Sequence, residues 1–417
     1  MLKTFVSNLF LLNILLVGAN FASADNEIHQ KRVAAVVTEY RHNSHADIIV
    51  SRLLQTDTLD GKGRDSPLKL VSLYTDQKPQ NDTSRMLAAS HRFPIYDTVR
   101  DTLTLGTGQL AVEGVLLIAE HGDYPMSPTG NRQYPKRRLF EKIVEVFRSS
   151  KRVVPVYCDK HLADNWEDAK FIYDTAREMK IPLMAGSSLP STWRKPAADV
   201  EPNKKLKEIV AITYGSTDAY GFHALEFVQA LAEQRQGGVV GIAAVQCLTD
   251  EAVWQAMNRE LFDLGLFHAA SDRLSIKAED ISSLRAAVAK PILFVLEYVD
   301  GLRAYIIELN GVAHGWAGAW RYEDGATAST HFYTQEARPG MHFTYLLHGI
   351  EKMMLTGSPS WPVERTLMTS GALDALFVSR LEDGRRLTTP QLQFSYHSNW
   401  RWKQPPPPPP GRPWSEQ

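Results

Sequence analysis

Short apolar runs alternate with amphipathic stretches through the first half of the chain. The runs occupy residues 33–37, 68–74, 112–119, 152–157 and 181–186. Strands that alternate with helices form a parallel sheet through right-handed crossovers. Because these runs are nearly all apolar rather than alternating, we expect helices on both faces of the sheet. The pattern predicts an α/β fold, with a doubly wound, Rossmann-like parallel sheet over residues 30–190.

After Pro190 the apolar segments become longer and alternate with polar positions. Residues 291–311 contain two strand-like halves separated by Asp300-Gly301, a pair typical of a hairpin turn. Helical periodicity over residues 219–234 and 344–355 predicts helices that cover one face of this sheet, and residues 362–379 resemble a closing helix. We therefore expect a C-terminal α+β domain over residues 191–395, with a large mixed or antiparallel sheet.

The two ends of the chain differ in composition from the two predicted domains. Residues 1–24 carry an early lysine, an apolar stretch and Ala-Ser-Ala, as a secretory signal peptide does. The apolar stretch is shorter than the roughly 20 residues of a bilayer span, so we expect export to the periplasm or extracellular space, an uncleaved anchor being the alternative. Residues 396–417 contain six consecutive prolines, which predict a Pro-rich tail.

Charge and cysteine content narrow the classes of function. The chain has 46 basic and 47 acidic residues, so no global field favours nucleic acid. We expect no membrane partner after signal cleavage. The sequence leaves open whether its two cysteines, Cys158 and Cys247, form a disulfide bond.

Lys160 directly follows one of the predicted strands and is flanked by Asp159 and His161. In an open α/β sheet, ligands bind at the carboxyl ends of the strands. A lysine at that edge is a candidate for acid–base chemistry. The alternative is a solvated surface lysine.

Three segments resemble the Gfo/Idh/MocA family of sugar oxidoreductases. Residues 153–169 are similar to that family's strand ending in Glu-Lys-Pro, with Lys160 at the lysine position. Residues 93–97, FPIYD, are similar to a connector before its third crossover helix. Residues 221–226, GFHALE, are similar to its Gly-x-His-x-x-Asp helix start. The resemblance extends from Arg32 to about Pro390.

The resemblance implies hydride transfer between NAD(P) and a hydroxyl of a sugar or cyclitol. Lys160 and His223 would be the catalytic residues, and Glu226 would orient the imidazole or bind a sugar hydroxyl. The alternative for His223 and Glu226 is a partly buried structural pair. Further expected substrate contacts are His161, Tyr134, Trp193 and Arg194, the last two entering the interdomain cleft.

The family's glycine-rich loop is absent, because residues 38–46 read TEYRHNSHA. Side chains in this loop could donate hydrogen bonds to phosphate instead. Asp76 would accept hydrogen bonds from the ribose, which favours NAD over NADP. The expected cofactor-binding residues, besides Lys160, are Thr38, Arg41, His42, Asn43, Asp76, Glu120 and His121.

Two other classes of function remain open. Histidines and carboxylates at strand ends are typical metal ligands, and a metal-dependent hydrolase or lyase would use His42, His45, His121, Asp123 and His161. Alternatively, the protein is a secreted, non-catalytic carbohydrate-binding protein on the same fold. From the resemblance we also expect a homo-oligomer, since open sheet faces in this family commonly pair subunits.

Overall fold

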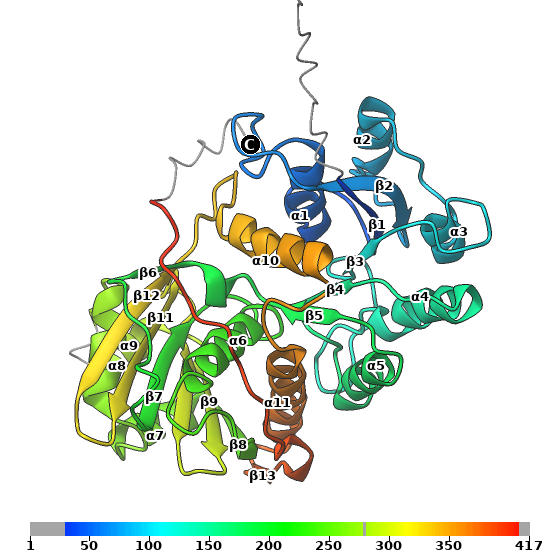
Figure 1. Ribbon diagram of the computed structural model, residues 1–417. Helices are drawn as coiled ribbons and strands as arrows, with labels where there is room; N and C mark the ends of the chain where they lie inside the picture. Colours follow the sequence, from blue (N-terminus) through cyan, green and yellow to red (C-terminus); the bar gives the residue numbers. More distant parts are fainter. Residues whose placement is uncertain (1–29, 278–280, 408–417) are drawn as a thin grey trace, which may run out of the picture.

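The computed structural model describes residues 30–277 and 281–407, which form two domains, each built on one sheet (Figure 1). The predicted signal peptide lies outside these residues. Among the helices within them, none combines the length and apolarity needed to span a bilayer. The two cysteines are buried and unpaired.

The first sheet is parallel and five-stranded, as predicted, and the structure gives its strand order as β2-β1-β3-β4-β5. The strand order reverses between β1 and β3, so the loops that follow these two strands diverge and leave a crevice at their carboxyl ends. In chain order its elements are β1 (Lys31–Val37), α1 (His45–Leu54), β2 (Leu68–Thr75), α2 (Ser84–His91), α3 (Val99–Thr104), β3 (Gly114–Ile118), α4 (Lys136–Ser150), β4 (Val156–Asp159), α5 (Trp166–Glu178) and β5 (Leu183–Gly186).

Successive side chains of the central strands serve opposite faces of the first sheet. Ala34 and Val36 of β1 pack in a core with α3, α4 and α5, whereas Val33 and Ala35 pack with α1. That second core also contains Leu346 and other residues of α10 (His342–Thr356). We expected a helix here to cover the second sheet. It instead lies on the first, because its apolar stripe complements the β1 and β3 face left open beside α1 (Figure 1).

The second sheet is mixed and eight-stranded, in the order β13-β8-β9-β10-β7-β11-β12-β6. β7 and β10 pair in parallel, and the predicted Asp300-Gly301 turn joins the antiparallel β9 and β10. Its elements and those around it are β6 (Trp193–Lys195), β7 (Leu206–Thr213), α6 (Tyr220–Ala232), β8 (Ile242–Thr249), α7 (Glu251–Asn258), α8 (Leu264–Arg273), α9 (Ile281–Ala287), β9 (Ile292–Tyr298), β10 (Arg303–Glu308), β11 (Trp316–Tyr322), β12 (Thr327–Tyr333), α11 (Val363–Leu381) and β13 (Leu387–Thr388), with short 3-10 helices at Leu189–Ser191 and Pro390–Leu392.

Helices cover both faces of the second sheet. One core joins the sheet to α6 and α11, and the other joins it to α7, α8 and α9. The expectation of a homo-oligomer assumed an open sheet face. In this chain α7, α8 and α9 pack on that face, and the homo-oligomer stays a prediction.

The described part of the C-terminal tail packs on β6, the edge strand of the second sheet. Trp402 Nε1 donates a hydrogen bond to Thr192 O at 2.8 Å, and Trp193 Nε1 donates one to Pro406 O. The backbone N–H of Arg194 donates to Gln404 Oε1 at 3.1 Å. The tail thereby covers an edge whose unpaired backbone groups would otherwise be open to another strand.

Candidate functional site

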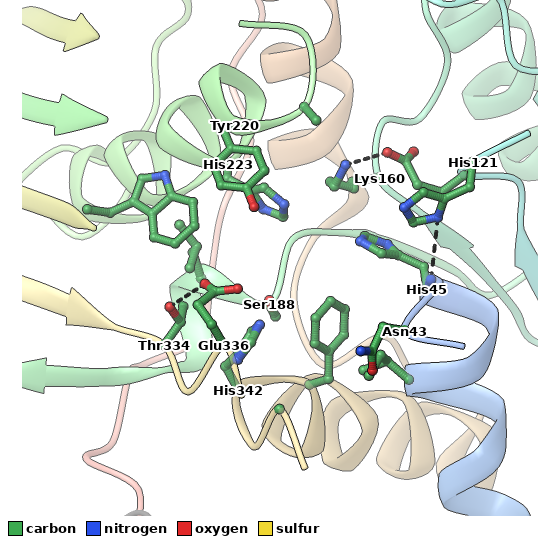
Figure 2. Close-up of a pocket in the computed structure, with 17 residues that line it drawn as sticks. Asn43, His45, His121, Lys160, Ser188, Tyr220, His223, Thr334, Glu336 and His342 are labelled. Carbon is green, nitrogen blue, oxygen red and sulfur yellow. Dashed lines mark hydrogen bonds and ion pairs between the residues drawn. The ribbon is translucent and has the colours of Figure 1, made fainter. Parts of the chain in front are cut away.

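A cavity of about 280 Å3 lies between the two domains, where the carboxyl ends of β3 and β4 face the start of α6 (Figure 2). Helices α1 and α10 close its other sides with their first residues. Its polar lining includes Asn43, His45, Glu120, His121, Lys160 and His223.

Lys160 stands directly after β4 and donates a hydrogen bond from Nζ to Glu120 Oε1 at 2.6 Å. Both side chains are buried, and Lys136 Nζ lies 3.8 Å from Glu120 Oε2. Burial alone would raise the pKa of Glu120, but the two lysines hold that pKa well below its ordinary value. Glu120 in turn keeps the pKa of Lys160 raised against the opposing effect of burial. The site therefore holds a charged ammonium beside the cavity.

The position of Lys160 is fixed by the turn around it. The peptide between Lys160 and His161 is cis. Lys136 Nζ, on α4, donates to the carbonyl oxygens of Asp159 at 2.9 Å and His161 at 2.6 Å. A buried ammonium on α4 thus ties together the carbonyls on either side of Lys160.

His223 enters the cavity from α6, in the second domain, opposite Lys160 (Figure 2). Its Nδ1 lies 2.5 Å from Ser187 Oγ. Burial, reinforced by the nearby Lys160, lowers the pKa of His223 well below its ordinary value. The structure brings the two expected catalytic residues to one cavity, with the imidazole neutral and the ammonium charged.

Glu226 lies behind His223 and outside the cavity lining. Its carboxylate accepts a hydrogen bond from Thr369 Oγ1 at 2.8 Å and one from the backbone N–H of Ser187 at 3.3 Å. Ser187 thus connects Glu226 to the imidazole, because it contacts both side chains. Burial raises the pKa of its carboxyl.

The second histidine of the cavity, His45, is the first residue of α1. Its Nδ1 lies 2.6 Å from Oδ2 of the buried Asp159. Burial would raise the pKa of Asp159, but His45 outweighs this effect and the pKa is lowered. The sequence suggested His45 as a metal ligand and as part of the loop expected to touch the cofactor. Its contact with Asp159, the last residue of β4, was not predicted, because it depends on how α1 packs against that strand end.

Sequence reasoning missed several cavity residues contributed by the second domain and by α10. Tyr220 directly precedes the GFHALE segment, so the sequence could have placed it beside His223. Only long-range packing brings the other missed residues to the cavity. Burial lowers the pKa of His342 to about 3, so its imidazole is neutral. These residues are Ser188, Tyr220, Trp316, Thr334, Glu336 and His342.

The fold implies a dinucleotide, whose pyrophosphate would lie at the N-terminus of α1. Side chains of the protein itself already accept hydrogen bonds from the donors at this end of the helix. Asp47 Oδ2 accepts from the backbone N–H of Asn43 at 2.8 Å and from Arg338 Nη1 at 2.8 Å. Ser44 Oγ caps the helix by accepting from the backbone N–H of Asp47 at 3.2 Å. The carboxylate of Asp47 thus fills the anion position of this helix.

The other loop residues expected to bind the cofactor also have partners within the chain. Thr38 Oγ1 donates to Glu120 O at 2.9 Å, which ties the ends of β1 and β3 together. Arg41 Nε donates to Glu39 Oε1 at 2.6 Å, and the half-exposed His42 lies 3.8 Å from Asp47. His121 Nδ1 faces the backbone N–H of His45 at 3.5 Å, and burial lowers the pKa of His121 to about 3.

Asp76 follows β2, as expected of a ribose-binding carboxylate, but both of its oxygens are engaged. They accept hydrogen bonds from Tyr74 at 2.8 Å, Tyr124 at 2.7 Å and Arg138 at 2.7 Å. Burial would raise the pKa of Asp76, but these bonds outweigh it and the pKa is lowered. The residues around the cavity fit a nicotinamide ring, whereas in this arrangement those at the pyrophosphate and ribose positions do not fit a dinucleotide.

Four expected substrate contacts lie outside the cavity. His161 is buried, with Nε2 2.8 Å from Asp218 O. Tyr134 lines a separate, shallow hollow with Arg41 and Asp123. Trp193 and Arg194 hold the tail instead, because β6 turns them toward residues 402–406 and away from the cleft. Arg194 stacks 5.0 Å from the ring of Phe332 and 4.4 Å from that of Trp402.

The expected metal ligands do not form a cluster. His45 and His121 have ring centroids 5.0 Å apart, but His42 is turned toward Asp47 and His161 toward Asp218. Within residues 30–277 and 281–407, no group of three or more His, Cys, Asp or Glu side chains is arranged to hold a metal ion. The metal-dependent hypothesis therefore has no ligand set in the described residues.

Comparison with known proteins places this fold. No protein-family model and no curated protein matches the sequence. Among solved structures, GenD2 from gentamicin A biosynthesis in complex with NAD has a TM-score of 0.55 and 14% identity, over 87% of this chain and 97% of that one. Apo scyllo-inositol dehydrogenase from Lactobacillus casei has a TM-score of 0.54 and 9% identity, over 87% and 98%.

UDP-N-acetylglucosamine 3-dehydrogenase GnnA from Acidithiobacillus ferrooxidans matches with a TM-score of 0.52 and 11% identity, over 84% of this chain and 97% of that one. Each match spans both domains, and identities this low carry the fold alone. The chain therefore has the two-domain fold of the Gfo/Idh/MocA-type dehydrogenases.

Proposed function

We propose that this protein is an oxidoreductase that transfers hydride between a nicotinamide dinucleotide and a hydroxyl-bearing carbon of a sugar or cyclitol. The observation that carries the proposal is the meeting of Lys160, from the first domain, and His223, from the second, at one cavity (Figure 2). The proteins of similar fold, by their descriptions, include sugar and cyclitol dehydrogenases, one of them in complex with NAD.

The cavity chemistry suits a neutral, polyhydroxylated substrate. Lys160 and Glu120 balance each other's charge, and the imidazoles of His121, His223 and His342 are neutral, so the three histidines would meet a hydroxyl as uncharged hydrogen-bond partners. The ammonium of Lys160 would hold the developing alkoxide by a charge-assisted hydrogen bond. Trp316, whose ring stacks on that of Tyr220, adds apolar surface to the cavity lining.

The proposed function requires that the protein bind a dinucleotide. A bound nicotinamide ring would supply the hydride acceptor or donor at the cavity. The rest of the dinucleotide needs the loop after β3 to release Asp76 and Gln77, because Tyr124 bonds the former and Asp123 the latter. NAD remains favoured over NADP, since Asp76 would repel a 2′-phosphate.

The filled pyrophosphate and ribose positions favour a second candidate. In that candidate the same cavity binds a polyol and performs proton transfer without a hydride acceptor. A secreted carbohydrate-binding protein that performs no chemistry would share the same filled positions. The three functions differ in two measurable properties, dinucleotide binding and turnover.

The test uses the chain from Asp25 onward, titrated calorimetrically with NAD and NADH and then assayed with a panel of sugars and cyclitols. We expect micromolar NADH binding, a raised thermal midpoint and reduction of NAD with at least one polyol. Absence of binding at millimolar dinucleotide overturns the proposal. Conversion of a polyol without a dinucleotide then supports the second candidate. Binding of a sugar or cyclitol without conversion supports the carbohydrate-binding protein.

We also propose that the protein works outside the cytoplasm, after removal of residues 1–24. Support comes from the composition of that segment alone. Cell fractionation followed by N-terminal sequencing tests it. A mature chain that begins near Asp25 in the exported fraction is expected, and an intact N-terminus in the cytoplasm contradicts it.

A further inference from the structure

Two histidines that line the cavity, His45 and His223, have unlike partners. His45 Nδ1 lies 2.6 Å from the carboxylate of Asp159, whereas His223 Nδ1 lies 2.5 Å from the hydroxyl of Ser187. A carboxylate can only accept a hydrogen bond, so the neutral form of His45 carries its proton on Nδ1. Nε2 of His45 is then unprotonated, and no partner for it is recorded among the described residues. That nitrogen is available to a ligand in the cavity.

The partners decide which imidazole can hold a second proton. An imidazole that accepts a proton becomes a cation, which a buried carboxylate at hydrogen-bond distance stabilises. The hydroxyl of Ser187 offers His223 no such charge, and the nearby ammonium of Lys160 opposes its protonation. Of the two, His45 is therefore the residue suited to take a proton from a substrate.

We infer that His45, oriented by Asp159, is the proton-accepting catalytic residue of this site, and that His223 binds the substrate as a neutral hydrogen-bond partner. The inference rests on the proposed function. In the step, the substrate O–H bond breaks and an N–H bond forms at His45 Nε2. The hydroxyl becomes an alkoxide held by Lys160, and the imidazole becomes an imidazolium paired with Asp159. A nicotinamide ring, if bound at the cavity, would supply the acceptor for the hydride in the oxidative direction.

The surroundings of His45 are compatible with this role. Its ring lies edge-on to Phe343 of α10 at 5.1 Å and to His121 at 5.0 Å between centroids. His121 stays neutral and so adds no repulsion. The charged and titratable groups that face His45 from the packed elements are Asp159, Glu120, His121, Lys160, His223 and His342.

The kinetic test compares His45→Gln, Asp159→Asn and His223→Gln with His348→Gln. His348 pairs with Asp57 at 3.2 Å outside the cavity, so it is a matched control for loss of a His–Asp pair. We expect kcat to fall by about 10²–10⁴-fold in His45→Gln, and His223→Gln to raise KM more than it lowers kcat. In Asp159→Asn, the acid limb of the kcat profile should move to lower pH, which a merely structural role would not produce. Unchanged kcat in a folded His45→Gln variant overturns the inference.

A second measurement decides the inference even if no substrate turns over. The protein is labelled with ¹⁵N at histidine, and myo-inositol is added as the probe. We expect the His45 proton on Nδ1 and a change in the Nε2 resonance when myo-inositol binds. In Asp159→Asn the proton should distribute over both nitrogens. A proton on Nε2 of His45 in the wild-type protein, or a response to the probe by His223 alone, contradicts the inference.

Discussion

Glu120 and Lys160 form a buried ion pair across two neighbouring strands, with 2.6 Å between Glu120 Oε1 and Lys160 Nζ. The pair brings together the loop after β3 and the strand end at β4. Each partner is nearly inaccessible to solvent, so each depends on the other for compensation of its charge.

Replacement of Glu120 by Gln should therefore destabilise the protein strongly. The variant leaves Lys160 buried without its anion, which typically costs about 3–5 kcal/mol. Urea denaturation at neutral pH measures the free energy of unfolding. Glu145→Gln is the control, because Glu145 pairs with Lys142 at an exposed position of α4, and its loss should cost less than about 1 kcal/mol. Equal losses in the two variants would contradict the prediction.

The same pair predicts how stability depends on acid. The pKa of Glu120 is lower in the folded than in the unfolded protein, so the folded state binds fewer protons. Its contribution to stability is complete above the ordinary glutamate pKa of 4.5 and is lost as the pH falls below it. Unfolding followed from pH 7 to pH 3 should show a steeper loss in the wild type than in Glu120→Gln. Parallel curves for the two proteins would show that Glu120 does not cause the loss of stability in acid.

Lys160→Met should lower turnover strongly, while Lys136, 3.8 Å from Glu120 Oε2, still compensates part of the buried charge of Glu120. Methionine keeps the length of the side chain but lacks the ammonium that would hold an alkoxide, so we expect kcat to fall by about 10²–10³-fold. Steady-state kinetics with the substrate from the polyol panel measures it. Lys142→Met, at an exposed site of α4, is the control. Turnover at the wild-type rate in Lys160→Met would refute the proposed role of this lysine.

Tyr124→Phe should strengthen dinucleotide binding. The change removes the 2.7 Å hydrogen bond that holds the loop after β3 to Asp76 and leaves Asp76 Oδ2 with Arg138 as its remaining partner, so that this oxygen can accept a hydrogen bond from a ribose. One hydrogen bond is worth about 1 kcal/mol, so the dissociation constant for NADH should fall by about fivefold. Calorimetry measures it, with Tyr134→Phe as the neighbouring control, 5.9 Å away between ring centroids. Weaker binding in Tyr124→Phe would mean that the phenol itself contacts the cofactor.

Gly186→Ala should disturb the support of His223. Gly186 has φ +117°, and an added Cβ would lie 2.6 Å from Glu226 Oε2 and 2.7 Å from Thr366 Oγ1. Gly301→Ala is the control, since Gly301 has φ +91° but no atom within 4 Å of such a Cβ. We expect Gly186→Ala to lose about 1–3 kcal/mol more than Gly301→Ala in thermal or urea unfolding. Similar losses would show that Glu226 moves aside freely.

Much of the fold could be predicted from the sequence, because local patterns carry it. The five apolar runs became the parallel sheet, Asp300-Gly301 became a hairpin turn, and residues 219–234 became α6. The position of Lys160 at the carboxyl end of a strand also followed from the local pattern. Periodicity did not reveal which sheet α10 would cover, because an apolar stripe on a helix does not determine which surface the helix packs against.

The identity of the neighbours around each polar side chain was decided by the tertiary structure. The sequence by itself placed Lys160 and His223 at element ends, since strand and helix boundaries are local properties. Only the packing of two domains brought them to one cavity, paired His45 with Asp159, and engaged Asp76 with Tyr124 and Arg138. Hydrogen bonds between residues 48 to 114 positions apart depend on loop conformation and domain contact, which no short-range pattern encodes.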